Sequence, residues 1–265
     1  MPMSADPRAV ESLLAFWAET GVEACYADAP IDRMAVAKPV RPAASGALAE
    51  RTPRSAPEAS AVAEEARVLA AGAADLDALR AAIANFEGCS LKTAGARQAV
   101  FARGAHDAPV MVIGEAPGAE EDIQGAPFVG RAGKLLDRML AAAGLEGRVF
   151  ITNTVFWRPP GNRDPTLAEQ RACAPFLERA IALVRPRLLL LVGGAASKSV
   201  LGRAEGILSI RGRWFGWRSA DGTLEIPALP TLHPAFLLRQ SAAKKKAWED
   251  LLTLTERLDR PERPA

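Results

Sequence analysis

Residues 114 to 137 read Gly114-Glu-Ala-Pro-Gly-Ala-Glu-Glu-Asp-Ile-Gln-Gly-Ala-Pro-Phe-Val-Gly-Arg-Ala-Gly-Lys-Leu-Leu-Asp137 and directly follow an apolar run, Val110-Met-Val-Ile113. The apolar run is typical of a buried strand, and helical spacing of apolar residues resumes at Leu135. Glycine and proline recur between them, and they fix backbone angles that other residues disfavour. The stretch therefore predicts a strand, a loop of one defined shape and a helix. Open α/β folds bind ligands at such strand ends.

Four short apolar runs have the character of buried strands, and helical patterns alternate with them. This alternation predicts an α/β fold of three layers, α/β/α, with a central four-stranded parallel sheet. The strands are expected at residues 110–113, 149–152, 188–192 and 224–232, and the helices at 133–143, 165–184, 195–202 and 243–258. Residues 212–222 are expected to form a hairpin-like excursion before the last strand.

Composition divides the chain into three parts. Residues 1–28 contain helix-like apolar spacing and are expected to form an N-terminal helical segment. Residues 29–66 are rich in Pro and Ala, with almost no large apolar side chains, so we expect a flexible linker that is dispensable for chemistry. Helical spacing resumes at residue 67, and residues 67–260 are expected to form the functional domain.

Length and composition bound the class of protein. A chain of 265 residues with 49% apolar content can bury one good core, and we expect a monomer. No apolar run approaches the roughly 20 residues that span a membrane, and the first residues lack a secretory signal, so we expect no membrane partner and a cytoplasmic location. Three scattered cysteines fit a reducing compartment. A net charge of +2 neither requires nor excludes nucleic-acid binding.

Polar and aromatic residues follow the predicted strands where parallel strand ends gather at one edge of the sheet. They are a carboxylate, Glu115, an aromatic ring, Phe128, a side-chain amide, Asn153, and an imidazole, His233. Together they can stack on a flat heterocycle, read its edge and stabilise an oxygen that becomes negative. Taken singly, each of the first three also has a structural interpretation: Glu115 as a turn cap, Phe128 as core and Asn153 as a turn residue. His233 is one of two histidines and sits at a predicted strand end before a proline, which favours a functional role.

Several longer motifs occur in one order along the chain. They are Gly114-Glu-Ala-Pro-Gly118, Gly125-Ala-Pro-Phe-Val-Gly-Arg-Ala-Gly133, Ile151-Thr-Asn153, Arg158-Pro-Pro-Gly-Asn-Arg163 and His233-Pro-Ala-Phe-Leu-Leu-Arg239. The chain from about residue 87 to 258 closely resembles the family-4 uracil-DNA glycosylases. The resemblance implies a uracil-DNA glycosylase-like fold and a DNA repair enzyme that flips uracil out of DNA and hydrolyses its glycosidic bond, leaving an abasic site.

The resemblance also implies roles for individual residues. Glu115 belongs to the loop that positions water, Phe128 stacks on the base, Asn153 reads the uracil edge, and His233 supports the leaving base, so Glu115 and His233 are the expected catalytic residues. Gly114 and Ala116 complete the expected base pocket. Uracil-containing DNA is the expected partner. The expected DNA contacts are Arg131, Lys134, Ser197, Lys198, Leu237 and Arg239.

Elementary chemistry agrees with these roles. Cleavage passes through a cationic sugar and an anionic base, which suits a carboxylate and a hydrogen-bond donor. The Asn153 amide can accept from uracil N3 and donate to O4, whereas cytosine presents the reverse at both atoms. Thymine has to be refused sterically, by a feature that the sequence does not reveal.

The cysteines depart from the family pattern. The family usually holds a 4Fe-4S cluster on four cysteines, and Phe86 and Trp157 stand at two of those positions here, leaving Cys89 and Cys173. Two thiolates cannot hold a cluster that needs four ligands, and Cys25 lies beyond the predicted linker. We therefore expect no cofactor and no metal, with a 4Fe-4S cluster as the less favoured alternative.

Two rival functions remain open at this point. One is a protein of the same superfamily that binds uracil-DNA covalently without turnover, which goes with a histidine in an inserted loop, although residues 119–137 contain none. The other is a non-catalytic nucleic-acid-binding module. Gly193 to Lys198 lacks the spacing of a phosphate-binding loop and is interpreted as a strand-to-helix turn. Lys244 to Lys246 fits a solvated face and a DNA contact equally well.

Overall fold

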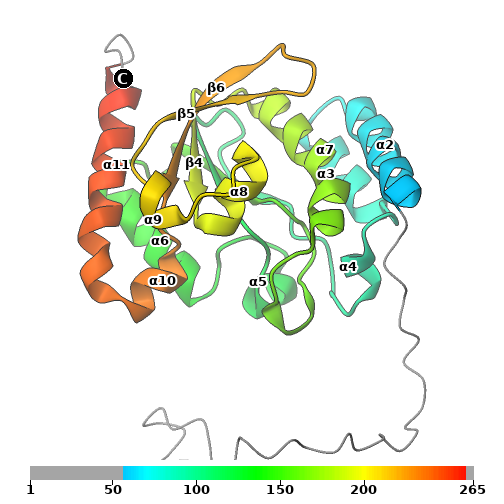
Figure 1. Cartoon of the computed structure of the whole chain (residues 1–265), viewed down its shortest axis with the longest axis horizontal. Helices are drawn as coiled ribbons and strands as arrows, with labels where there is room; N and C mark the ends of the chain where they lie inside the picture. Colours follow the sequence, from blue (N-terminus) through cyan, green and yellow to red (C-terminus); the bar gives the residue numbers. More distant parts are fainter. Residues whose placement is uncertain (1–55, 261–265) are drawn as a thin grey trace, which may run out of the picture. The chain divides into compact units, whose positions relative to one another are not determined.

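A computed structural model describes residues 56–260 of the chain. Its strands form one mixed sheet in the order β1-β3-β2-β4-β6-β5. Figure 1 labels β4, β5 and β6 of this sheet and most of the helices. The central strands β3, β2, β4 and β6 run parallel, which confirms the predicted four-stranded parallel sheet, whereas β1 and β5 pair antiparallel at the two edges. The strands are β1 (Ala102–Gly104), β2 (Val110–Gly114), β3 (Val149–Asn153), β4 (Leu188–Val192), β5 (Phe215–Arg218) and β6 (Glu225–Thr231).

Both faces of the sheet are covered, as near-continuous apolar strands require. Strand β2 shows the alternation: Val110 and Val112 belong to the apolar cluster on one face, and Met111 and Ile113 to the cluster on the other. Every residue of β2, β3 and β4 is buried. The three-layer α/β/α prediction is therefore confirmed, and the predicted hairpin is β5 with β6.

One face is covered by α2 (Ala56–Gly72), α3 (Leu76–Asn85) and α7 (Leu167–Val184). The sequence predicted a linker up to residue 66 with helical spacing from residue 67, and this boundary was wrong because α2 already begins at residue 56. Alanine favours helix strongly, and its small side chains let α2 pack closely, with Ala66 and Ala70 buried. The helical run breaks after Gly72, where Asp75 caps α3 by accepting from the backbone N of Ala78 at 2.8 Å.

The opposite face carries α6 (Arg131–Ala142) and α11 (Lys244–Asp259), whose leucines pack against β2, β3 and β4. Shorter helices lie in the connections: α4 (Ser90–Thr93), α5 (Ala119–Gln124), α8 (Gly194–Leu201), α9 (Ile207–Ile210), α10 (Pro234–Arg239) and the 3-10 turns Pro160–Asn162 and Ser241–Ala243. The predicted N-terminal helical segment, and the linker up to residue 55, lie outside the described residues. No helix among residues 56–260 is long and apolar enough to cross a membrane.

Candidate active site

The carboxyl ends of the parallel strands meet at one edge of the sheet, as predicted. Gly114 at the end of β2 pairs with Asn153 at the end of β3, and Val192 at the end of β4 pairs with Thr231 at the end of β6. His233 lies two residues after the end of β6 and caps the N-terminus of α10. The chain thus brings the side chains that follow separate strands to one place.

Phe128 lies at this edge of the sheet. Its backbone φ of 55° is in the left-handed region, which residues other than glycine rarely adopt. Two side chains that the sequence analysis missed hold its loop in place. Arg103 donates to the carbonyl oxygens of Pro127 and Phe128 at 2.8 and 3.1 Å. The Glu121 carboxylate accepts from the backbone N of Val129 and Gly130 at 3.0 and 2.9 Å. This support fixes the ring by hydrogen bonds from two directions.

Glycine is required where the loop touches the sheet. A Cβ on Gly114 would stand 2.4 Å from Asn153 Oδ1 and 2.5 Å from Phe128 Cζ. A Cβ on Gly133 would stand 1.7 Å from the Phe128 carbonyl oxygen. All three distances are shorter than real Cβ contacts, so only glycine lets the ring and the amide approach Gly114, and the Phe128 backbone approach Gly133, this closely.

The Asn153 side chain is 1% exposed, and neither its Oδ1 nor its Nδ2 has a hydrogen-bond partner among the described residues. Buried amides are almost always paired, and leaving one unpaired costs about 1–3 kcal/mol. A structure that retains this cost beside an aromatic ring points to a ligand that carries both a donor and an acceptor on one edge. Uracil meets that requirement.

His233 carries its proton on the nitrogen that faces away from its own helix. Its Nδ1 accepts from the backbone N of Ala235 at 3.2 Å, which leaves Nε2 as a donor. Burial, helped by the Arg239 charge and opposed by Glu121, lowers the pKa of His233 to about 4. The ring lies 5.8 Å from that of Phe128, centroid to centroid. At neutral pH this side chain is a neutral donor beside the aromatic ring.

Glu115 differs from an ordinary surface carboxylate. Burial in the first place, and the charge of Asp164 in the second, raise the pKa of Glu115 to about 7. Its Oε1 is buried and has no hydrogen-bond partner within residues 56–260. Perturbed groups of this kind are typical of catalytic sites.

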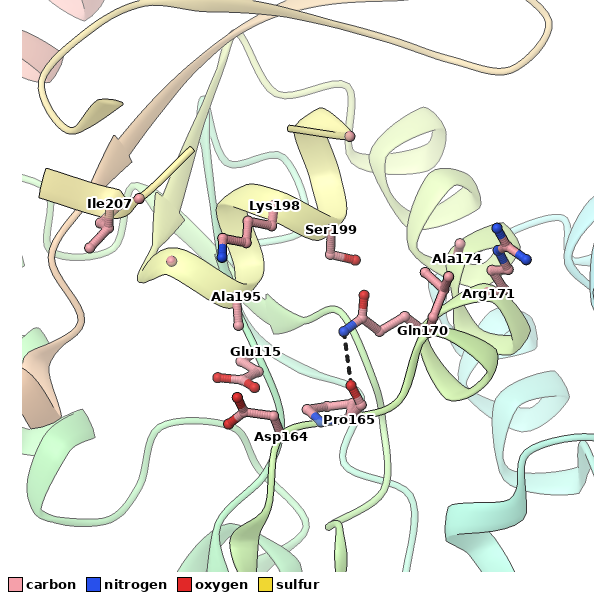
Figure 2. Close-up of a pocket in the computed structure, with 14 residues that line it drawn as sticks. Glu115, Asp164, Pro165, Gln170, Arg171, Ala174, Ala195, Lys198, Ser199 and Ile207 are labelled. Carbon is pink, nitrogen blue, oxygen red and sulfur yellow. Dashed lines mark hydrogen bonds between the residues drawn. The ribbon is translucent and has the colours of Figure 1, made fainter. Parts of the chain in front are cut away.

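Two cavities meet at Glu115. The first, of about 580 Å³, is lined by Ala116, Phe128 and His233 together with Glu115. The second, of about 710 Å³, extends from Glu115 to Lys198 on α8 (Figure 2). The first cavity therefore unites Glu115, Ala116, Phe128 and His233, with Gly114 and Asn153 packed against its Phe128 wall.

The predicted DNA contacts fall into two groups. Arg239 lines the first cavity and Lys198 the second, and both are exposed. Arg131 and Lys134 are exposed on the first turn of α6. Arg239 and Lys198 therefore lie at the site, and Arg131 is adjacent in sequence to Ala132, which lines the first cavity.

Leu237 and Ser197 do not fit a DNA contact. Leu237 is 0% exposed and packs in an apolar cluster, whereas Leu238 beside it is 41% exposed. Successive helix residues point about 100° apart, so an error of one position moves the side chain from the surface to the core. Ser197 is fully buried, and its hydroxyl donates to the carbonyl oxygen of Gly193 at 2.8 Å. Leu238 is therefore the leucine of this pair that is exposed on α10.

Cys89 and Cys173 are the two cysteines that remain at the positions where the family resemblance implies ligands of an iron-sulfur cluster. Their sulfur atoms lie 3.9 Å apart in the core, where burial raises the pKa of Cys173. Phe86 and Trp157 are each 1% exposed, and Phe86 packs edge-on against Phe176 at 5.1 Å. Aromatic side chains thus fill the positions that the family resemblance gives to two cysteines. The residues present do not fit a four-cysteine cluster, and Cys25 lies outside the described residues.

Comparison with known proteins identifies the family to which this chain belongs. The family model of the uracil DNA glycosylase superfamily matches residues 101–252. A type-4 uracil-DNA glycosylase of Pyrobaculum aerophilum is 38% identical over 182 residues, 67% of this chain and 91% of the relative. That of Sulfurisphaera tokodaii is 39% identical over 171 residues, 62% of this chain and 77% of the relative. This chain belongs to the uracil DNA glycosylase superfamily.

Proposed function

We propose that this protein is a uracil-DNA glycosylase, a hydrolase of base excision repair that removes uracil from DNA and leaves an abasic site. The observation that carries the proposal is the buried Asn153 amide, which lacks a partner among the described residues and packs with the Phe128 ring around Gly114. Similarity to relatives named type-4 uracil-DNA glycosylase supports it.

Base recognition follows from the two sides of the pocket. A uracil flipped out of the duplex stacks on Phe128, which offers an apolar face. Asn153 Oδ1 accepts from uracil N3, and Nδ2 donates to O4. Cytosine offers an acceptor at N3 and a donor at N4, so it leaves the same buried atoms unpaired. That mismatch discriminates by a large factor, because the penalty is paid inside the protein.

Bond cleavage requires charge stabilisation at both ends. As the bond between C1′ and N1 lengthens, the sugar becomes cationic and the base gains negative charge. His233 Nε2 donates to uracil O2, where that charge collects. Ionised Glu115 stabilises the sugar and orients a water. The water oxygen bonds to C1′, the C1′–N1 electron pair leaves with uracil, and the water proton is lost to the medium or to the departing base.

Exposed basic side chains at the site supply DNA affinity. Arg131, Lys134, Lys198 and Arg239 are all exposed, which supports their proposed role as phosphate contacts. Such contacts provide salt-dependent binding without sequence preference. We propose that the protein acts on DNA as a cytoplasmic monomer.

Leu238 is proposed to fill the space that the flipped uracil leaves in the base stack. Leu238→Ala should lower excision from double-stranded DNA at least several-fold and leave excision from single-stranded DNA nearly unchanged, because only the duplex must be unstacked. Single-turnover rates on both substrates measure this. Leu252→Ala, which truncates an exposed leucine on α11, is the matched control. Equal losses on both substrates would exclude the wedge role.

We propose that the protein works without an iron-sulfur cluster. The purified protein should be colourless and iron-free and should still excise uracil. The reason is that Phe86 and Trp157 fill, with apolar packing, the positions where two cluster cysteines would stand. Iron analysis and a visible absorption spectrum of protein purified without oxygen measure this. A brown preparation with stoichiometric iron would show the interpretation of the cysteines to be wrong.

The proposed activity is tested on matched oligonucleotides that carry one uracil, cytosine or thymine. Treatment with the protein followed by alkali should break the uracil strand alone, because alkali cleaves abasic sites. Glu115→Gln serves as the low-activity control. An intact uracil strand that still binds the protein would favour the non-catalytic rival.

A further inference from the structure

Asp164 faces Glu115 at the boundary between the two cavities. Both residues line both cavities, and Figure 2 shows their carboxylates beside each other, one on the loop after β2 and the other on the loop before α7. Two like charges so placed repel each other, and the repulsion favours a protonated partner. A second carboxylate at this point has no part in the base recognition described above.

The loop that carries Asp164 is held firmly on both sides. The Arg163 guanidinium makes a bidentate pair with Glu169 at 2.7 and 2.8 Å. Glu169 also accepts from the backbone N of Thr166 at 2.7 Å. Gln170 donates to the carbonyl oxygen of Pro165 at 3.1 Å. Asp164 lies between these anchored neighbours, so its backbone cannot easily move away from Glu115.

Glu115 is anchored as well. Its carbonyl oxygen accepts from Thr154 Oγ1 at 2.7 Å and from the backbone N of Val155 at 3.1 Å. Its carboxylate has one buried oxygen without a hydrogen-bond partner in the described part of the chain. These hydrogen bonds restrain both backbones, and a proton on Glu115 relieves the repulsion between the two carboxylates.

Other charges surround the pair, and they do not replace Asp164. The other titratable side chains that line the first cavity or the second are Glu121, Arg163, His233, Arg239, Arg171 and Lys198, of which His233 is neutral at neutral pH. Among these described groups and Asp164, the charge that raises the pKa of Glu115 is that of Asp164, and burial is the larger cause. Neutralising Asp164 should therefore remove part of the rise.

We propose that Asp164 is a positioning residue that sets the protonation state of Glu115, and with it the pH range in which the enzyme works. The inference rests on the proposed function only where it concerns activity, because the coupling between the carboxylates exists in the protein without DNA. Ionised Glu115 is the working form. Excision should therefore fall as the pH drops through about 7, and Asp164 places that fall near neutrality.

The negative charge of Asp164 opposes the binding of DNA phosphates, so we infer that this carboxylate has another role in the site. It is an exposed acid at the mouth of a site that has to accept a polyanion, beside the basic residues that attract phosphates. A neutral side chain there would bind DNA more tightly. The carboxylate offsets this loss if it acts on Glu115 and adds negative charge near the cationic sugar.

The direct test is titration of the Glu115 carboxyl by carbon-13 NMR in protein labelled at glutamate Cδ, without DNA. Glu115→Gln identifies the signal. Asp164→Asn should lower the midpoint by at least about half a pH unit, as expected for a like charge removed from close range. Asp164→Glu keeps the charge and should stay near wild type. Asp107→Asn changes an exposed carboxylate on a distant turn and should have no effect.

The second readout is the pH profile of single-turnover excision for the same variants. Its acid limb should shift to lower pH in Asp164→Asn alone. An unchanged NMR midpoint in Asp164→Asn would overturn the inference even if the enzyme excises uracil. A shifted midpoint in a protein that releases no uracil would support the carboxylate pair and reject the proposed function instead.

Discussion

We expect His233→Ala to lower the single-turnover rate of uracil excision by roughly a hundredfold or more, while affinity for uracil-DNA should stay within a few-fold of wild type. The Nε2 donor acts on charge that exists mainly in the transition state, and losing one such donor costs on the order of 3 kcal/mol. Affinity is retained because phosphate contacts made elsewhere supply most of it. Rapid-quench kinetics and a binding titration at fixed salt measure the two quantities.

Two variants sharpen this prediction. His106→Ala removes the other histidine of the chain, which is exposed and lies 6.5 Å from Phe150, and it should excise at the wild-type rate. His233→Gln restores an N–H donor and should recover part of the lost rate. If His233→Ala weakened binding as much as it slowed cleavage, His233 would stabilise the bound substrate as much as the transition state. The proposed role at uracil O2 would then be wrong.

We expect Asn153→Asp to lower excision of uracil by roughly a hundredfold or more and to bring weak excision of cytosine. The carboxylate loses the donor to uracil O4, and the buried environment leaves that oxygen unpaired. When protonated, the new side chain can donate to cytosine N3 and accept from N4. Excision rates on matched uracil and cytosine oligonucleotides give the ratio directly.

The control for Asn153→Asp is the same substitution at an exposed position. Asn85→Asp at the end of α3 should change neither rate. A thermal unfolding scan shows whether Asn153→Asp is folded under the assay conditions. Uracil excision at the wild-type rate in a folded Asn153→Asp protein would remove Asn153 from base recognition.

The position of the site could be predicted from the sequence because it depends on topology. Apolar runs that alternate with helical patterns specify a parallel sheet, and parallel strands place their carboxyl ends together. Glu115, Asn153 and His233 each follow such a run, so their convergence needs no knowledge of side-chain packing. The edge strand β1 escaped prediction because it is short and lacks a continuous apolar run, whereas β5 falls within the predicted hairpin-like excursion.

Features that depend on side-chain packing were out of reach. Helix α2 packs through alanines, and its residues up to 66 lack the large apolar side chains that indicate a buried helix in a sequence. Leu237 and Leu238 are indistinguishable in composition, and the turn of α10 alone decides which one is exposed. Asp164 acquires its importance from Glu115, which lies far away in the sequence, and no local pattern marks that pairing.

The most direct measurement is a balance between free uracil and abasic sites, from an oligonucleotide with one uracil incubated with excess protein. The account predicts one free uracil and one alkali-labile site per strand, with no DNA retained on the denatured protein. His233→Ala should reach the same end point far more slowly. Absence of free uracil, or a protein–DNA adduct that survives denaturation in place of it, would contradict hydrolytic excision at this site.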